Sequence, residues 1–484
     1  MASRSDGYTR LASHYAAELT RLEHEHATGD VESVRARFES IWPQVQSGIR
    51  WFLSPQGTAH GREGLARAYA GGVGRRVVRL LVLGRPRAQW SRLQLHVNDP
   101  RERGSDHLSA LLDLAAACTD LGKLRSAEKI YLRAHLQAVS IEHPVHAAEA
   151  LEGLGRALFL DRRHAEAIAV VSEAIRRYSA DVQPSGRVPL APYALLGAIL
   201  LARGEPARAE DLLEPVAREL VDGDDAGRTR EGCEILLSLG RAKRILARTS
   251  AAVSLLERSV EMIRAFYGED HEQLVLPLNE LALAYQVNSQ PELARDTLVD
   301  ALRIEENARG PSYPGLAVRL ANLGILCRES DELAQSLEYL DRAQEILARA
   351  SHWNISRSYA AQVHRERART FIALRDPTRA RSDLASATRI LRVRVSAEHP
   401  SWAALLFALG CYCELSHRMS AALCLHERAA RTRWDVFGAH HPETRESLEK
   451  LAELRAGMAR NAPPSPSPRA VGATGKDSLP STRN

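Results

Sequence analysis

Apolar residues recur along the chain with helical spacing in two alternating patterns. In the first pattern a leucine is followed directly by glycine or alanine, as at Leu281-Ala282. The second pattern begins some twelve residues later and places a small, a large and a small residue four and three positions apart, as at Ala294, Leu298 and Ala301. Spacings of three and four put side chains on one face of an α-helix. Each pair of patterns therefore predicts two amphipathic helices.

The pair of patterns recurs eight times between residues 107 and 442, at intervals of 40 to 44 residues and mostly 42. The small–large–small triplets are Ala127/Tyr131/Ala134, Ala167/Val171/Ala174, Ala209/Leu213/Val216, Ala252/Leu256/Ser259, Ala294/Leu298/Ala301, Ser336/Leu340/Ala343, Ala380/Leu384/Ala387 and Ala422/His426/Ala429. Turn-forming residues such as Gly122 and Asp376-Pro377 separate the two helices of a repeat. A period of this length predicts stacked helix pairs that bury their apolar faces against one another.

Small residues on both helices predict how the two helices of a pair approach each other. We expect the glycine or alanine of the first helix to face the alanines of the second, with the large residues filling the gaps beside them. Repeat seven departs from this pattern, because His364 and Arg367 stand where other repeats have leucine. The departure predicts either a locally rotated helix or a weaker joint that acts as a hinge.

The repeat resembles the tetratricopeptide repeat, and its 42-residue form resembles that of kinesin light chains. The resemblance is carried by "LNELALAY" in the first helix, by "ELARDTLVDALRI" in the second, and by the closing segments "YGEDHE", "RGPSYP", "AEHP" and "FGAHHP". It implies an all-α fold, a right-handed α-solenoid of about eight helix-turn-helix repeats. A ninth helical segment, "ETRESLEKLAELRAGM", is expected to cap the array. The solenoid is thus predicted to span residues 107–459.

The two ends of the chain differ from the repeats. Residues 1–106 are helical by pattern, and "VESVRARFESIWPQVQSGIRWFL" resembles the segment that enters the repeat sensor of bacterial NB-ARC, or STAND, proteins. We find no phosphate-binding loop of the ATPase that such proteins carry. The Arg-rich residues 60–103 fit either an anion contact or a solvated helix face. Residues 460–484, rich in proline and serine, are predicted to be disordered.

Composition adds little that is specific to function. Apolar residues make up 45% and aromatic residues 5% of the chain, which suits helices, and the net charge of +5 is too small to favour a dedicated nucleic-acid-binding domain. The longest uncharged run, residues 188–202, is shorter than a membrane span and is expected to form a buried helix. Six cysteines without a secretory signal predict reduced thiols, no membrane association and a cytoplasmic location.

A cluster of cysteine and histidine near the end of the repeats is the strongest candidate for metal chemistry. Its members are Cys411, Cys413, His417, Cys424 and His426. Cys411 and Cys413 lie two residues apart on one helix and so point in different directions, and no zinc-type C-x-x-C spacing occurs. We therefore expect no metal, no cofactor and no catalytic residue, and interpret His426 as a core histidine with a local partner.

The resemblance also implies where a ligand would bind, because first helices of tetratricopeptide arrays line a concave groove. The groove candidates carried over onto this chain are Arg156, Arg241, Arg244, Asn279, Asn322, Arg328, Arg365 and Arg369. Guanidinium groups bind carboxylates bidentately, so an extended acidic peptide would fit a stripe of such arginines. The alternative is that these arginines pair with neighbouring glutamates and face water.

The sequence therefore predicts a non-enzymatic scaffold that binds a partner protein or peptide in the groove. A second interpretation is a sensor or regulatory subunit of a bacterial signalling or defence system, working with a separately encoded effector or ATPase. The sequence names neither the partner nor the oligomeric state.

Overall fold

The computed structural model describes residues 31–52, 104–181, 189–222, 229–350, 356–394, 400–439 and 441–460, with a few positions at 14–22 and residue 91. Every regular element of these residues is helical. Contacts divide the chain into two compact units, Met1–Ala284 and Tyr285–Asn484. Residues 461–484 of the predicted tail 460–484 and most of the predicted region 1–106 lie outside the described residues, so those two domain assignments stay predictions.

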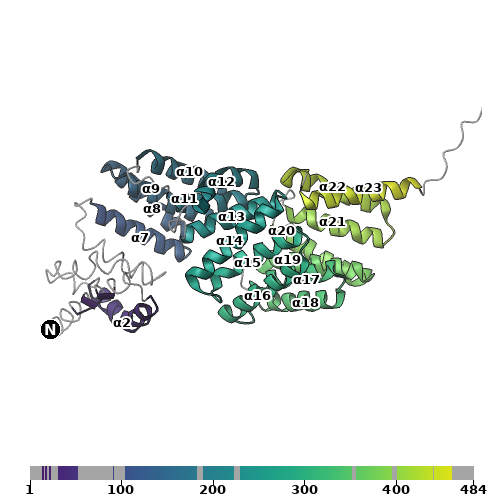
Figure 1. Cartoon of the computed structure of the whole chain (residues 1–484), viewed down its shortest axis with the longest axis horizontal. Helices are drawn as coiled ribbons and strands as arrows, with labels where there is room; N and C mark the ends of the chain where they lie inside the picture. Colours follow the sequence, from purple (N-terminus) through teal and green to yellow (C-terminus); the bar gives the residue numbers. More distant parts are fainter. Residues whose placement is uncertain are drawn as a thin grey trace, which may run out of the picture. The chain divides into compact units, whose positions relative to one another are not determined.

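The first unit contains four complete helix pairs and most of the first helix of the fifth (Figure 1). After α2 (Val31–Phe52), its helices are α7 (Ser105–Asp120), α8 (Leu124–Ser140), α9 (Pro144–Leu160), α10 (His164–Asp181), α11 (Leu190–Ala202), α12 (Pro206–Asp222), α13 (Arg230–Ile245), α14 (Thr249–Tyr267), the short 3-10 helix η2 (Glu272–Leu274) and α15 (Val275–Val287). Residues 190–202 of the uncharged run form α11, which is largely buried as expected.

The second unit begins within α15 and contains the remaining repeats and the capping helix. Its helices are α16 (Pro291–Arg309), α17 (Leu316–Glu329), α18 (Leu333–Arg349), α19 (Ser356–Ala373), α20 (Pro377–Arg394), α21 (Pro400–Leu415), α22 (Met419–Phe437) and α23 (Pro442–Arg460). The predicted polar cap is present at α20, where the Asp376 carboxylate accepts hydrogen bonds from the backbone N–H groups of Thr378 and Arg379. The predicted all-α repeat architecture is thus confirmed.

Within each unit the helices pack in the order of the chain, and the first helices of successive repeats also contact one another. Such contacts join α7 with α9 and α11 with α13 in the first unit, and α17 with α19 and α19 with α21 in the second. First helices therefore form one continuous wall of each unit. Side chains on this wall from different repeats are close enough to build a shared site.

Packing within a repeat corrects our expectation about the small residues. Where the first pattern carries a glycine after its leucine, that glycine faces the large central residue of the triplet in the same repeat, rather than its alanines. A Cβ atom on Gly324 would lie 2.7 Å from Cγ of Leu340, and one on Gly155 would lie 2.2 Å from Cγ2 of Val171. The same contact pairs Gly197 with Leu213, Gly240 with Leu256 and Gly410 with His426. The glycine makes room for one bulky side chain to insert between the helices.

The turn between the two helices of a repeat holds one residue in the left-handed backbone region. Two of these residues are glycines, Gly122 and Gly204, which adopt positive φ without steric conflict. The equivalent residues in the other repeats are Arg162, Ala247, Ser289, Asp331, Arg375 and His417, with φ between 56° and 64°. A Cβ atom makes this conformation unfavourable by about 1–2 kcal/mol.

Replacing Ala247 with glycine is therefore expected to stabilise the first unit by about 0.5–1 kcal/mol, because relief of the strain outweighs the greater flexibility of the unfolded chain. Urea denaturation followed by circular dichroism measures the change. The matched control is Ala421→Gly in α22, an exposed helical position where the same substitution should destabilise by about 1 kcal/mol. Equal effects of the two substitutions would contradict the prediction.

The polar residues of repeat seven are held by ion pairs. The Arg367 guanidinium lies 2.8 Å from Asp341 and 3.1 Å from Asp383, and His364 Nδ1 lies 2.7 Å from the same Asp383 carboxylate. Asp383 is buried. This joint thus replaces leucine packing with a buried charged network, and the hinge stays a prediction.

No helix in the described part of the chain combines the length and the apolar character that crossing a bilayer requires.

Candidate functional site

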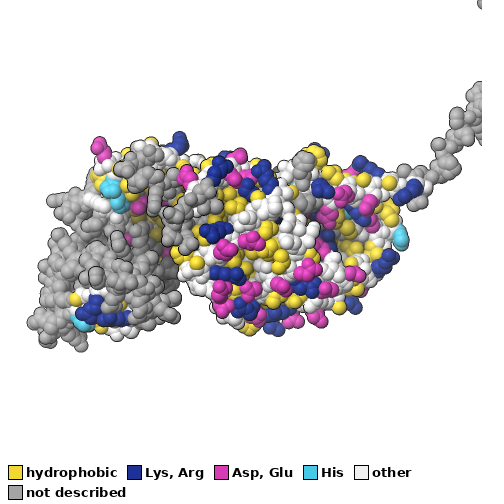
Figure 2. Space-filling model, in the orientation of Figure 1, with side chains coloured by type: hydrophobic (Ala, Val, Ile, Leu, Met, Phe, Trp, Pro, Cys, Tyr) yellow, Lys and Arg dark blue, Asp and Glu magenta, His cyan; other side chains and the backbone are white. Residues whose placement is uncertain are grey.

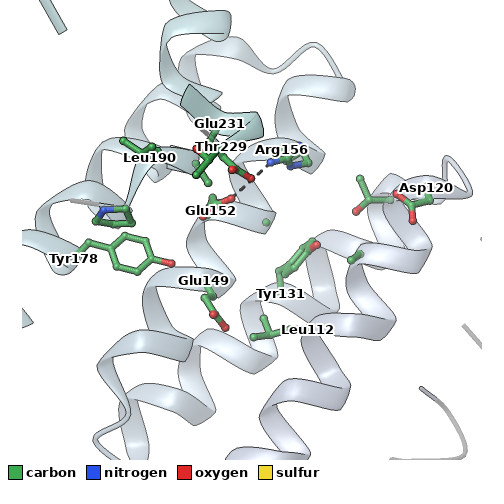
Figure 3. Close-up of a pocket in the computed structure, with 15 residues that line it drawn as sticks. Leu112, Asp120, Tyr131, Glu149, Glu152, Arg156, Tyr178, Leu190, Thr229 and Glu231 are labelled. Atoms are coloured by element: carbon green, nitrogen blue, oxygen red, sulfur yellow. Dashed lines mark ion pairs between the residues drawn. The ribbon is translucent and has the colours of Figure 1, made fainter. Parts of the chain in front are cut away.

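A cavity of about 610 Å³ opens on the first-helix wall of the first unit (Figure 3). Helices α7, α8, α9 and α10 line it, together with the starts of α11 and α13. The lining residues are Leu112, Ala116, Thr119, Asp120, Tyr131, Glu149, Glu152, Gly153, Arg156, Tyr178, Pro189, Leu190, Ala191, Thr229 and Glu231. Three successive repeats and the start of a fourth thus contribute to one site.

The helical register of α9 places the central polar groups of this cavity. Glu149, Glu152 and Arg156 stand three and four residues apart, so all three project from one face of the helix. Gly153 lies between them, and a Cβ atom there would be 2.2 Å from Cε1 of Tyr131, so its absence lets the Tyr131 ring lie against α9. In Figure 3 the rings of Tyr131 and Tyr178 flank the carboxylates of α9.

A capped helix start delivers another carboxylate to the cavity. The Thr229 hydroxyl accepts a hydrogen bond of 3.1 Å from the backbone N–H of Gly232 and so begins α13. Glu231 then lies in the first turn, where the helix dipole favours a negative charge. Without this cap the start of α13 would be free to fray, and the position of Glu231 would be lost.

Negative charge dominates the cavity. Its charged lining residues are four carboxylates, Asp120, Glu149, Glu152 and Glu231, against the single guanidinium of Arg156. Arg156 Nη2 lies 3.6 Å from Glu152 Oε1, as the dashed line in Figure 3 marks. Burial raises the pKa of Glu152 above its ordinary value, and Glu149 and Glu231 raise it further although Arg156 opposes them. Burial and the same α9 carboxylates also raise the pKa of Tyr178.

This arrangement suits a cationic group carried on an apolar stem. A positive charge beside Glu152 would offset the desolvation and the repulsion that raise its pKa. Leu112, Ala116 and Leu190 provide apolar surface for the stem, and the two tyrosine rings can contact a cation through their faces. A lysine or arginine side chain of a partner polypeptide has both features.

The predicted groove arginines of the first unit pair with carboxylates. Arg156 lies in the cavity, whereas Arg241 and Arg244 both contact the buried Glu280, at 3.3 and 2.9 Å. Asn279 is also buried. Glu280 was missed by the sequence reasoning, although it immediately precedes the repeated leucine of its helix.

The predicted arginines of the second unit converge on one carboxylate. Arg365, Arg328 and Arg369 lie 2.7, 3.3 and 3.6 Å from the oxygens of Glu366, whose side chain is 2% exposed. Arg369 also contacts Glu446 on α23, at 3.3 Å. Asn322 is buried on α17. On the face drawn in Figure 2, basic and acidic side chains are likewise interspersed over the described residues. The role of these eight residues in peptide binding stays a prediction.

Two members of the cysteine–histidine cluster come together in the second unit, joined by a carboxylate that sequence reasoning missed. One ligand atom each of Cys411, Glu414 and His426 lies within 4.8 Å of the others. His426 Nε2 is 2.8 Å from Glu414, whose second oxygen is 3.1 Å from the Lys450 ammonium. Burial raises the pKa of the Cys411 thiol to about 11. A lysine cation thus already lies against the carboxylate of this group.

His426 belongs to the core, as predicted. Its side chain is fully buried and its ring packs edge-on against Phe407. The bond to Glu414 supplies the local partner that we expected.

Comparison with known proteins supports the repeat assignment. Residues 274–349 match the family model described as "Tetratricopeptide repeat". The chain is 22% identical over 358 residues to "Protein KINESIN LIGHT CHAIN-RELATED 3" of Arabidopsis thaliana, covering 72% of this chain. It spans about half, 54%, of the length of that relative.

Among solved structures, a tetratricopeptide repeat protein from Parabacteroides merdae is 14% identical, with a TM-score of 0.42, covering 64% of this chain and 98% of that one. A Rap protein complexed with Competence and Sporulation Factor is 11% identical, with a TM-score of 0.45, covering 74% of this chain and all of that one. The segment that resembles NB-ARC proteins forms α2 except for its last residue, and its likeness to those proteins stays a prediction.

Proposed function

We propose that this chain, whose residues 274–349 match the tetratricopeptide-repeat model and which resembles a kinesin light chain-related protein, is a non-enzymatic scaffold that binds an extended partner polypeptide along its first-helix wall. The cavity of the first unit is the proposed main contact, and a lysine or arginine side chain of the partner is its ligand. The single observation that carries this proposal is the group of four carboxylates and two tyrosines around one partly apolar cavity.

The charge of the cavity changes the chemistry expected of the partner. The sequence favoured an acidic peptide because of the groove arginines, but in the first unit those arginines already contact Glu152 or Glu280. The proposed partner segment therefore carries a positive side chain where it crosses α9. A preference for acidic residues stays a prediction for the second unit, where three guanidiniums share Glu366. The alternative of a sensor subunit stays a prediction that no described residue favours.

Selection of a random displayed peptide library against the purified protein tests the proposal. We expect the selected peptides to share a lysine or arginine, and the variant Glu152→Gln/Glu231→Gln to bind them about ten- to a hundredfold more weakly, because charge-assisted contacts are removed. The control Glu261→Gln/Glu269→Gln removes two exposed carboxylates of the same unit outside the cavity and should bind normally. Selected peptides without a common positive residue would overturn the proposal.

A further inference from the structure

At three joints between neighbouring repeats, an ion pair links one second helix to the residue just before the next second helix, at a fixed register. One partner directly follows the first residue of a triplet, and the other lies four residues before the next triplet. Glu128 and Arg163 form such a pair at 2.9 Å, and Arg295 and Glu332 form one at 2.8 Å. Glu210 and Arg248 form a third. The order of the charges varies, but in each of these pairs they are opposite.

The joint between α20 and α22 instead has two arginines, Arg381 and Arg418, at these two positions. The triplets of α16 and α18 have counterparts in α20 and α22 that lie 86 residues further along the chain. Helices α16 and α18 carry the ion pairs Arg295–Glu332, Arg303–Asp300 and Arg342–Glu306, at 2.8, 2.7 and 2.6 Å. In the joint between α20 and α22, the three arginines have arginine counterparts, Arg381, Arg389 and Arg428. The three acids Glu332, Asp300 and Glu306 are replaced by Arg418, Ser386 and Arg392. The joint between α20 and α22 therefore has none of the three acids that form ion pairs in the joint between α16 and α18.

As a result, the joint between α20 and α22 carries five arginines at the counterpart positions. Arg381, Arg389, Arg392, Arg418 and Arg428 are all exposed. None of their guanidinium groups forms an ion pair with a residue that the structure describes. By contrast, the acid Asp383 on α20 is buried and pairs with His364 and Arg367, so it cannot neutralise them.

An apolar hollow lies among these arginines. A cavity of about 490 Å³ is lined by Arg381, Arg389 and Arg392 of α20 and by the apolar or hydroxyl-bearing side chains of Leu384, Ala385, Thr388, Leu409 and Tyr412. Leu384 is buried, whereas Leu409 and Tyr412 of α21 are half-buried. The hollow thus has an apolar floor and a basic rim.

We propose that this surface, formed by α20 and α21 and extended by the α22 arginines, binds an acidic segment of a partner protein that inserts an apolar side chain between its carboxylates. Guanidinium groups on the rim would pair with the carboxylates, as Arg295 and Arg342 pair with glutamates at the counterpart joint. This surface consists largely of second-helix residues, to which the first helix α21 adds Leu409 and Tyr412, and it lies in the second unit, whereas the acidic cavity lies in the first. The proposal therefore concerns a second binding site.

The chemistry of the hollow favours an acidic polypeptide over a nucleic acid. A nucleic acid would be held mainly through its phosphates, and that contact has no use for a floor of leucine and alanine side chains. An acidic peptide with a leucine or phenylalanine would use both the rim and the floor.

Fluorescence anisotropy with three labelled probes tests the proposal. The first is a twelve-residue peptide, about half Asp and Glu, with two central leucines; the second has serines in place of the leucines; the third is an oligothymidylate of equal charge. We expect saturable binding of the first, at least tenfold weaker binding of the second and third, and weakening by salt. Tighter binding of the oligothymidylate, or no saturable binding of the first peptide, would overturn the proposal.

Restoring the missing acids gives a variant that should still fold. Ser386→Asp/Arg392→Glu/Arg418→Glu reproduces the charges of the α16–α18 joint, where they form ion pairs, so thermal unfolding should be unchanged or shifted upward. Binding of the acidic peptide should fall at least tenfold. The control Ser126→Asp/Arg176→Glu/Arg349→Glu makes the same change in net charge at exposed positions elsewhere and should keep its affinity. Equal affinity of the two variants would contradict the proposal.

Discussion

Replacing Glu366 with glutamine is expected to lower the free energy of unfolding of the second unit by about 3–5 kcal/mol. The glutamine has nearly the same shape but no charge. Arg328, Arg365 and Arg369, whose side chains are 12%, 17% and 23% exposed, would then face one another without the carboxylate that they share. Removing one member of a buried charge cluster costs far more than the net stability that the intact cluster contributes.

The effect of Glu366→Gln should depend on pH. Burial alone would raise the pKa of Glu366, but the three guanidiniums outweigh it and hold the pKa at about 2. A carboxyl whose folded pKa lies below its unfolded value, about 4.3, stabilises the fold fully above that value and loses the contribution as pH falls toward 2. The difference in stability between wild type and variant should therefore be largest above about pH 5 and shrink at lower pH.

Hydrogen exchange of the α17 and α19 amides measures this loss locally, which avoids assuming that the two units unfold together. The matched control is Glu345→Gln on α18, because Glu345 is 70% exposed and 3.9 Å from Arg349. Its effect should stay within about 0.5 kcal/mol. Protection of α19 that is equal in the two variants would show that Glu366 does not hold the cluster together.

The repeat architecture could be predicted because its signal is local and recurs many times. The residues that separate the helices, such as Gly122 and Asp376-Pro377, act through their own backbone or the next turn. The triplets repeat a pattern whose spacing is set by the α-helix itself. The error concerned which side chain inserts between the two helices. Residue sizes alone did not show that Leu340, rather than the alanine beside it, packs against Gly324.

Some partners of the groove arginines could not be predicted in the same way, since they lie one or more repeats away, whereas Arg365 and Arg369 have Glu366 on their own helix. Arg328 and Glu366 are 38 residues apart, and Arg369 and Glu446 are 77 apart. A periodic signal nevertheless existed. Glu280 directly precedes Leu281-Ala282, and Glu366 directly precedes Arg367-Ala368 at the equivalent place in its repeat; both glutamates are buried. A buried acid at such a position needs a cation from a neighbouring repeat.

The acidic cavity of the first unit was missed for a related reason. Glu149, Glu152 and Arg156 were recognisable as one face of a helix, but Tyr131 and Glu231 come from repeats before and after it. The sequence reasoning emphasised the arginines because guanidinium groups bind carboxylates bidentately. Only the register between repeats shows that carboxylates outnumber them at this site.

Truncating Leu340 to alanine is expected to destabilise the second unit by about 2–5 kcal/mol. The Leu340 side chain is fully buried and fills the space that Gly324 leaves between α17 and α18. Gly324 has no side chain that could fill the resulting cavity. The short turn between α17 and α18 already holds Asp331 in a strained conformation, so the two helices should move together only slightly to close the cavity. The loss should therefore lie in the upper half of this range.

Combining Leu340→Ala with Gly324→Ala should be less damaging than the two single effects added together. Alone, Gly324→Ala places a Cβ atom 2.7 Å from Leu340 Cγ, which overpacks the joint, although alanine is the better helix former. Without the leucine, the same methyl group occupies part of the cavity. We expect a favourable coupling of about 1 kcal/mol or more from the four urea denaturation curves of this double-mutant cycle. Strictly additive effects would mean that glycine and leucine do not share one packing site, and the insertion of a bulky side chain against each first-helix glycine would lose its energetic basis.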